Sequence, residues 1–182
     1  EVAYSANKIS KFSPPYIVKP PNQGSSRGVS IVREPNRFNE AFNNAIQYDS
    51  YAMIEEFIDG KEITVGLIDG EALPIVEINT GNHFYDYNQK YTLGLSRYIC
   101  PAKINRIDTL RIKKNAEDIF ESLGCSTYGR VDFLVDKQGL WYFLEMNTLP
   151  GMTSTSLLPK AASAYGISFN QMIDKIISLS VG

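Results

Sequence analysis

The chain has 182 residues, of which 43% are hydrophobic and 21% are charged, and these ordinary proportions exclude a disordered or collagen-like protein. Its 18 basic and 20 acidic side chains give a net charge of −2, so no broad cationic surface exists to hold nucleic acid or an anionic membrane. We therefore expect neither as a partner, and any anion must be held by a local group of residues. The length allows one compact domain or two small lobes.

Two cysteines, Cys100 and Cys125, are too few for a disulfide framework, and no stretch approaches the ~18 apolar residues of a membrane span. A reducing compartment, the cytoplasm, is therefore expected. The opening residues carry neither an initiating Met nor the apolar core of a signal peptide. We read the chain as a piece of a longer protein.

The first part of the chain predicts a β-loop-β-α unit. Residues 16–19 and 29–33 are short runs rich in β-branched residues, and a Gly/Ser loop separates them. Pro35 suits the first turn of a helix, and apolar residues then recur at helical spacing as far as residue 48. Residues 51–57 and 62–68 resemble further strands.

A hairpin, a long loop, a helix and a second hairpin follow. Asp69-Gly70 is a strong hairpin signal, and the sheet is expected to continue through Ile78. Residues 80–97 show no periodicity, and a loop of that length is usually functional, so we expect a mobile loop there. Helical spacing predicts a helix over 106–123, strand patterns predict a hairpin of 128–135 with 140–147, and a capping box at Ser168 predicts a last helix.

The second hairpin separates two kinds of side chain. Pairing Val135 with Leu140 places Asp132 and Glu145 as diagonal neighbours about 7–8 Å apart. Alternation then puts four polar residues on one face: Arg130, Asp132, Glu145 and Asn147. The other face is expected to be entirely apolar: Val131, Phe133, Val135, Leu140, Tyr142, Leu144 and Met146.

The polar face predicts a metal site. Two carboxylates and an amide, with no His or Cys nearby, offer the oxygen ligands that suit Mg²⁺ shared with substrate phosphates better than zinc. The alternative is a surface salt-bridge cluster around Arg130.

Two earlier segments suit a nucleotide. Residues 19–28 form a glycine-containing loop whose backbone N–H groups and Lys19 could hold phosphate, although the segment lacks a Walker motif and could be an ordinary hairpin loop. Residues 55–58 and Glu62 could supply carboxylates, backbone groups and an aromatic ring for a nucleoside, or form a solvated acidic strand edge.

Seven motifs, in order along nearly the whole chain, closely resemble the D-alanine–D-alanine ligases, enzymes of the ATP-grasp superfamily. These motifs are Tyr16-Ile-Val-Lys-Pro, Gly24-Ser-Ser-Arg-Gly28, Glu55-Glu56-Phe-Ile, Tyr85-Asp-Tyr-Asn-Gln-Lys-Tyr91, Ile99-Cys-Pro-Ala, Gly129-Arg-Val-Asp-Phe133 and Glu145-Met-Asn-Thr-Leu-Pro-Gly151. The resemblance implies an α+β ATP-grasp fold, with antiparallel and mixed sheets and packed helices in two lobes around a nucleotide cleft. Residues 1–57 would be the remainder of the central lobe, and residues 58–182 the C-terminal domain with the mobile loop 80–97.

The resemblance also implies a role for each matching residue. The ATP-binding residues would be Lys19 at the phosphates, Glu55, Glu56, Phe57 and Ile58 around adenine, Glu62 at the ribose, and Lys90 on the closing loop. The catalytic residues would be Ser25, Lys90, Tyr91, Arg130 and Gly151, and Ser156 and Leu157 would contact the second D-alanine. Asp132, Glu145 and Asn147 would hold two Mg²⁺ ions, for which Mn²⁺ could substitute.

The implied reaction joins two D-alanines. A D-alanine carboxylate attacks the γ-phosphate of ATP, and the amine of a second D-alanine attacks the resulting acyl phosphate.

The resemblance does not include the family's N-terminal domain or the start of its central lobe, so the isolated chain is expected to be inactive. The full-length protein is expected to be a homodimer. The alternatives are a nucleotide-binding fragment without turnover and another ATP-grasp carboxylate–amine ligase, such as a D-alanine–D-lactate ligase. The Lys90-Tyr91 pair favours dipeptide formation.

Overall fold

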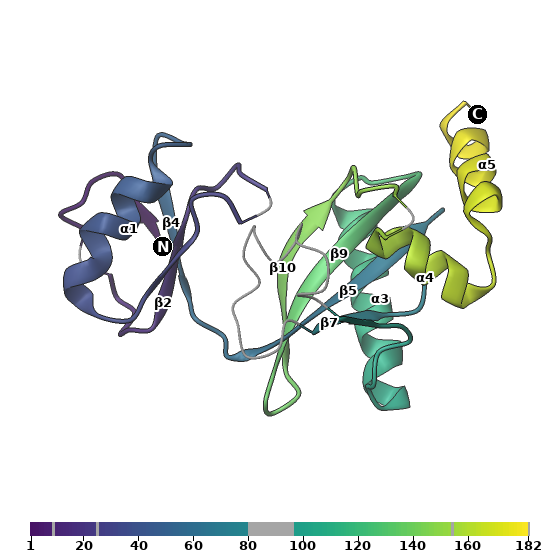
Figure 1. Ribbon diagram of the computed structural model, residues 1–182, viewed down its shortest axis with the longest axis horizontal. Coiled ribbons are helices and arrows are strands. Elements are labelled where there is room, and N and C mark those ends of the chain that lie inside the picture. The colour runs from purple at the N-terminus through teal and green to yellow at the C-terminus, as the bar shows by residue number, and fades with distance from the viewer. Residues whose placement is uncertain (9, 25, 80–96, 154, 182) are drawn as a thin grey trace. The chain divides into compact units, whose positions relative to one another are not determined.

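The computed structural model describes residues 1–8, 10–24, 26–79, 97–153 and 155–181. Contacts divide the chain into two compact units. Within the described residues, the first unit is Glu1–Ile58 and the second combines Asp59–Asn79 with the part that begins at Arg97 (Figure 1). No helix in the described part of the chain is both long and apolar enough to span a bilayer.

The first unit is a four-stranded antiparallel sheet with one helix. Its strands are β1 (Val2–Ala3), β2 (Tyr16–Lys19), β3 (Ser30–Val32) and β4 (Ala52–Glu56), in the order β1-β4-β2-β3. The predicted helix is a 3₁₀ turn, η1 (Pro35–Arg37), followed by α1 (Phe38–Ala45). Because side chains alternate along β2, its inward residues pack on α1. This core includes Tyr16, Val18, Ile54, Phe38 and Phe42.

The second unit is built on a six-stranded antiparallel sheet. Its strands are β5 (Gly60–Ile68), β6 (Glu71–Ala72), β7 (Val76–Asn79), β8 (Arg97–Ile99), β9 (Tyr128–Asp136) and β10 (Trp141–Asn147). The order is β10-β9-β5-β7-β8, with β6 paired to β5. Asp69 and Gly70 both have positive φ angles, as the predicted two-residue hairpin turn requires.

The helices of this unit are α3 (Arg106–Ser122), α4 (Leu157–Tyr165) and α5 (Phe169–Ser180). Helix α3 packs on one face of the sheet through Ile112, Ala116 and Phe120 (Figure 1). Helix α4 packs against β5, where a Cβ added to Gly66 would lie 2.6 Å from Leu158 Cδ1. Because Gly66 pairs with Arg130, alternation places α4 on the sheet face opposite α3.

The β9–β10 register differs from the predicted one. Val135 pairs with Trp141 rather than with Leu140, and a β-bulge interrupts the ladder between Phe143 and Glu145. The longer turn shifts the pairing by one residue, which moves the side chains of Trp141–Phe143 to the face opposite the predicted one. The bulge shifts the pairing by one more residue, so the side chains from Glu145 onward return to the predicted face. Asp132 and Glu145 are therefore directly opposed, and the predicted diagonal separation is wrong.

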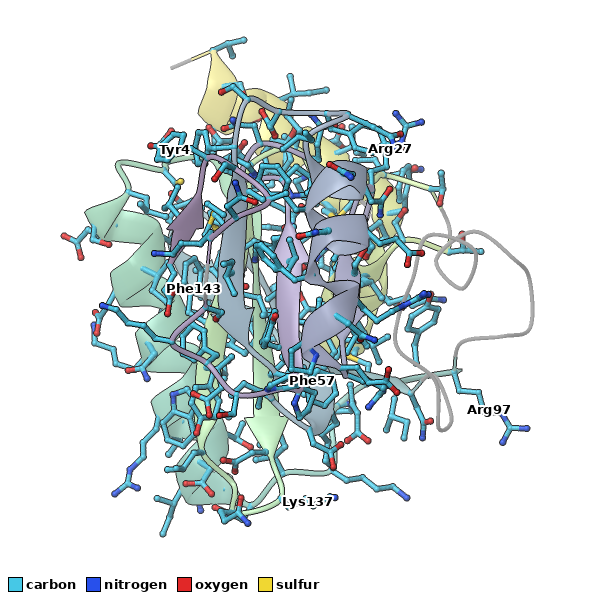
Figure 2. The ribbon with its side chains drawn as sticks, turned by 90° about the vertical axis from the view of Figure 1, so that its left-hand side faces the viewer. Tyr4, Arg27, Phe57, Arg97, Lys137 and Phe143 are labelled. Carbon is cyan, nitrogen blue, oxygen red and sulfur yellow. The ribbon has the colours of Figure 1, made fainter. Side chains whose placement is uncertain are left out.

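The predicted polar face is confirmed, but the apolar face is only partly correct. Tyr142 pairs with Leu134 on the polar side, and Leu140 lies outside the strand and is exposed. Trp141 and Phe143 take their places on the core side, and Figure 2 shows Phe143 beside α3, with which it lines a shallow pocket. The bulge at residue 144 is the physical reason, since it breaks the period of two that the prediction assumed.

The last helix and its capping box are confirmed. Ser168 Oγ accepts the N–H of Gln171, and the Gln171 side chain accepts the N–H of Ser168. The strands β1 and β8 and the helix α4 were not predicted. Residues 80–96 of the predicted mobile loop lie outside the described residues.

Candidate functional site

Asp132 is the centre of the polar cluster on the second unit's sheet. Arg130 forms a two-pronged salt bridge with it, because Nε donates to Oδ1 at 2.9 Å and Nη2 donates to Oδ2 at 2.9 Å. Asn147 Nδ2 donates to Oδ2 at 2.9 Å, and Thr64 Oγ1 lies 2.5 Å from Oδ1. The carboxylate is only 2% exposed, so these four donors replace the water that it has lost.

The charge of Arg130 is held by its acidic neighbours. Burial alone lowers the pKa of this guanidinium, but hydrogen bonds from Arg130 to Asp132 and the charges of Asp132, Glu145 and Glu62 outweigh burial and raise the pKa above its ordinary value. The arginine therefore stays a cation, next to a group of three carboxylates.

Asn147 shows how closely two of these carboxylates converge. Its Nδ2 lies 2.9 Å from Asp132 Oδ2 and 3.2 Å from Glu145 Oε1. A single polar atom therefore reaches both acids. A hard cation needs such a point between carboxylate oxygens, and the amide can offer a further oxygen, so the donor set fits Mg²⁺ or Mn²⁺. Within the described residues, no group of three or more His, Cys, Asp or Glu side chains could hold a metal. A cation here would need further oxygens, such as those of phosphate groups.

Sequence reasoning missed Thr64. It is a polar residue in the otherwise apolar run of β5, and it pairs directly with Asp132. Its position two residues after Glu62 puts both side chains on the face that carries Asp132. The register of β5 against β9 was the missing information, because the sequence alone does not reveal which strands are neighbours.

The segment before α4 brings three predicted residues together. Ser156 Oγ accepts the N–H of Thr153 at 3.0 Å, and a Cβ added to Gly151 would lie only 2.9 Å from the same oxygen. Glycine therefore lets the hydroxyl approach the backbone closely. Leu157 begins α4 and is buried, so its side chain belongs to the core while the first-turn N–H groups have no partner within the helix.

In the first unit, the predicted phosphate lysine is paired with a predicted nucleoside residue. Lys19 Nζ lies 2.6 Å from Glu55 Oε2, and the two side chains are 23% and 36% exposed. They come from the neighbouring strands β2 and β4. Lys19 ends β2, immediately before the loop that leads into the Gly/Ser segment.

The rest of the acidic strand end is less buried. Glu56 is exposed, and Phe57 and Ile58 are half-buried beyond the end of β4. The Arg33 guanidinium lies 5.7 Å from the centre of the Phe57 ring (Figure 2 labels Phe57), so a cation–π contact covers one face of the ring. Three predicted catalytic residues, Ser25, Lys90 and Tyr91, lie outside the described residues.

The site residues thus form two groups. The second unit carries Glu62, Arg130, Asp132, Glu145 and Asn147 on one sheet face, and the first unit carries the Lys19–Glu55 pair. A family model described as the C-terminus of D-Ala–D-Ala ligase matches residues 2–178. This chain belongs to that ligase family.

Curated relatives of this family support the assignment. The chain is 48% identical to the D-alanine–D-alanine ligase of Methylacidiphilum infernorum over 169 residues, which cover 93% of the chain and 56% of the relative. It is 44% identical to the ligase of Geotalea uraniireducens over 168 residues, covering 92% of the chain and 54% of the relative. The chain therefore spans about half the length of these ligases.

Solved structures of ligases share the fold. A Bacillus anthracis D-alanine–D-alanine ligase complexed with ATP matches the whole chain with a TM-score of 0.82 and 34% identity, over 60% of the solved chain. The VanG D-Ala:D-Ser ligase of Enterococcus faecalis matches 93% of the chain, and 50% of its own, with a TM-score of 0.80 and 34% identity. The expected α+β ATP-grasp fold is confirmed. The assignment of residues 1–57 and 58–182 to its two lobes, with a nucleotide cleft between them, stays a prediction.

Proposed function

We propose that this chain is the nucleotide- and metal-binding part of an ATP-dependent ligase that joins two D-alanines for peptidoglycan synthesis. The observation that carries the proposal is the convergence of Asp132 and Glu145 on Asn147 beside a half-buried arginine. Family membership adds the reaction, in which an acyl phosphate forms and is attacked by an amine. Both steps place negative charge on oxygens, and preorganised cationic donors stabilise such charge.

On the second unit, Asp132, Glu145 and Asn147 would hold Mg²⁺, which supplies positive charge to the phosphate oxygens. Arg130, with its charge secured by its acidic neighbours against the effect of burial, would stabilise the oxyanion together with the backbone N–H of Gly151. Glu62 lies on the same sheet face, and its carboxylate would accept hydrogen bonds from ribose hydroxyls.

On the first unit, Lys19 would bind ATP phosphates. Its present partner is Glu55, and a lysine can exchange one anion for another because its three donors rotate freely. Glu55 and the backbone at Glu56 and Ile58 would meet the adenine edge. Phe57 would line the base pocket, and its ring is already ordered against Arg33.

The second substrate would meet the start of α4. The first-turn N–H groups at Leu157 and the Ser156 hydroxyl suit a carboxylate, because helix N-termini attract anions. D-alanine is the proposed nucleophile, since the Lys90-Tyr91 pair matches the dipeptide-forming members of the family, and Ser25 would orient the closed loop and the first substrate. A cytoplasmic location and a homodimeric whole protein are part of the same proposal.

The nucleotide site is tested with Glu145→Gln. Glu145 is exposed, so the change should leave folding intact while removing one charged ligand. Isothermal titration of the chain with ATP in the presence of Mg²⁺ should show at least tenfold weaker binding than in the unmodified chain. Glu121→Gln is the matched control, because Glu121 is an exposed acid on α3. Equal affinity of all three proteins would contradict the site.

A further inference from the structure

Thr64 occupies an unusual position for a polar residue. It lies in the middle of β5 with no exposed surface, and the other polar or charged side chains buried among the described residues are Glu77 and Asp132. β5 pairs with β9 so that Thr64 is directly opposite Asp132. A hydroxyl at such a site is costly unless it forms a hydrogen bond, because no water reaches it.

The hydroxyl has two acceptors and one proton. Its oxygen lies 2.5 Å from Asp132 Oδ1 and 3.3 Å from the Val131 carbonyl oxygen. The shorter contact, to a charged acceptor, is the stronger one, so the proton goes to the carboxylate. Thr64 is thus bound to the same Oδ1 that Arg130 Nε contacts.

The donors approach Asp132 from different strands. Thr64 reaches Oδ1 from β5, whereas Asn147 reaches Oδ2 from β10, on the other side of β9. The Oδ2 atom also points toward the region where Asn147 meets Glu145. The Thr64 bond to Oδ1 from the β5 side therefore adds to the hold of Arg130 on the carboxylate, opposes its rotation and helps to keep Oδ2 directed at Glu145.

We propose that Thr64 is a positioning residue that orients Asp132 for a divalent cation. This role rests on the proposed function, because it assumes that Asp132 and Glu145 share that cation. Thr64 itself does not touch the cation in this assignment; it acts through the carboxylate. Hydrogen bonds to metal ligands typically change metal affinity by about 10–100-fold.

The test uses Thr64→Val, which removes the hydroxyl and keeps the shape, and Thr64→Ser, which keeps the hydroxyl. Mn²⁺ binding to the chain with ATP present is followed by electron paramagnetic resonance of free Mn²⁺. We expect Thr64→Val to weaken Mn²⁺ about tenfold and Thr64→Ser to stay within about twofold of the unmodified chain. Thr64→Ala provides a second variant without the hydroxyl, should the valine disturb packing.

Competition between ions separates positioning from a merely structural role. Mg²⁺ demands near-ideal octahedral geometry, whereas Ca²⁺ tolerates irregular ligands. Loss of orientation in Thr64→Val should therefore weaken displacement of Mn²⁺ by Mg²⁺ more than displacement by Ca²⁺. Thr109→Val is the control, because it removes a hydroxyl that donates to Asn105 O on the exposed start of α3.

The outcomes distinguish the two proposals. Unchanged Mn²⁺ affinity in Thr64→Val and Thr64→Ala, with a loss in Glu145→Gln, would overturn the role of Thr64 and leave the metal site standing. Unchanged affinity in all variants, including Glu145→Gln, would overturn both. An equal loss for Mg²⁺ and Ca²⁺ would mean that Thr64 only supports the fold.

Discussion

Asp132 was predicted from the sequence as a metal ligand on the polar face of the hairpin, and the structure shows that it is the most buried charge in the polar cluster. Strand alternation correctly assigned it to the non-core face, but that face is partly closed, and a pattern of side chains does not reveal what lies above a sheet. Breaking a buried pair by removing one partner costs about 3–5 kcal/mol. Asp132→Asn would therefore disturb the fold through Arg130, and this is why exposed Glu145 is the better variant for testing ligand binding.

Cys100 offers a pH-dependent test at the level of one residue. Partial burial raises the pKa of its thiol above the ordinary value of 9.0. In a Cys125→Ala variant, alkylation by iodoacetamide should be slow at pH 8 and should still be accelerating between pH 9 and 10, because the thiolate is the reactive form.

The sign of the linked stability follows from the same shift. The folded state keeps the proton to higher pH than the unfolded state, so this contribution is complete below pH 9 and is lost as the pH rises through the folded pKa. The chain unfolded in urea is the reference. A folded protein whose alkylation reached half its maximum at a lower pH than the unfolded chain would contradict the prediction.

At the level of elements, the sequence predicted where strands and helices lie better than how they pair. The hairpin 128–147, the helix after residue 105 and the last helix follow from periodicity and caps, which are local properties. The β9–β10 bulge does not, because one extra residue in a strand leaves no mark in composition. Helix α4 was not predicted, and its Pro159 is tolerated because it lies in the first turn, where its absent N–H would have no partner.

The capping box of α5 can be tested directly. Ser168→Ala removes the acceptor for the N–H of Gln171 and should lower the free energy of unfolding by about 0.5–2 kcal/mol. Ser178→Ala is the matched control within the same helix, since the Ser178 hydroxyl only donates to the Asp174 carbonyl. Urea denaturation measures both variants, and equal midpoints for Ser168→Ala and Ser178→Ala would show that the cap contributes nothing.

At the scale of the whole molecule, the described residues contain two separate hydrophobic cores. Tyr16, Val18 and Ile54 belong to the first, and Ile63, Val65 and Phe133 belong to the second, with no residue shared. Motif order predicted the family and the fold, because all seven motifs had to agree. Motif order could not predict how the two groups of site residues are arranged relative to each other, because the motifs identify residues within each unit and carry no information about the arrangement of the units.

The two cores predict two unfolding transitions. The single tryptophan, Trp141, packs on the second core, whereas far-UV circular dichroism reports both units. Ile54→Ala leaves a cavity in the first core and should destabilise that unit by about 2–5 kcal/mol. The Trp141 fluorescence midpoint in urea should stay unchanged, while Ile63→Ala should shift it. Equal shifts of Trp141 fluorescence in the two variants would mean that the chain unfolds as one cooperative unit.

Because Arg130 is already bound to Asp132, a cation at the proposed site would have to exchange with the guanidinium. A guanidinium carries five N–H donors, and Asp132 engages two of them in a fixed fork. A divalent cation that takes the carboxylate oxygens competes with this fork for the same lone pairs. Cation binding at Oδ2 would then return Nη2 to the arginine, so a donor that neutralises the salt-bridged carboxylate would become available to an incoming anion as the cation arrives.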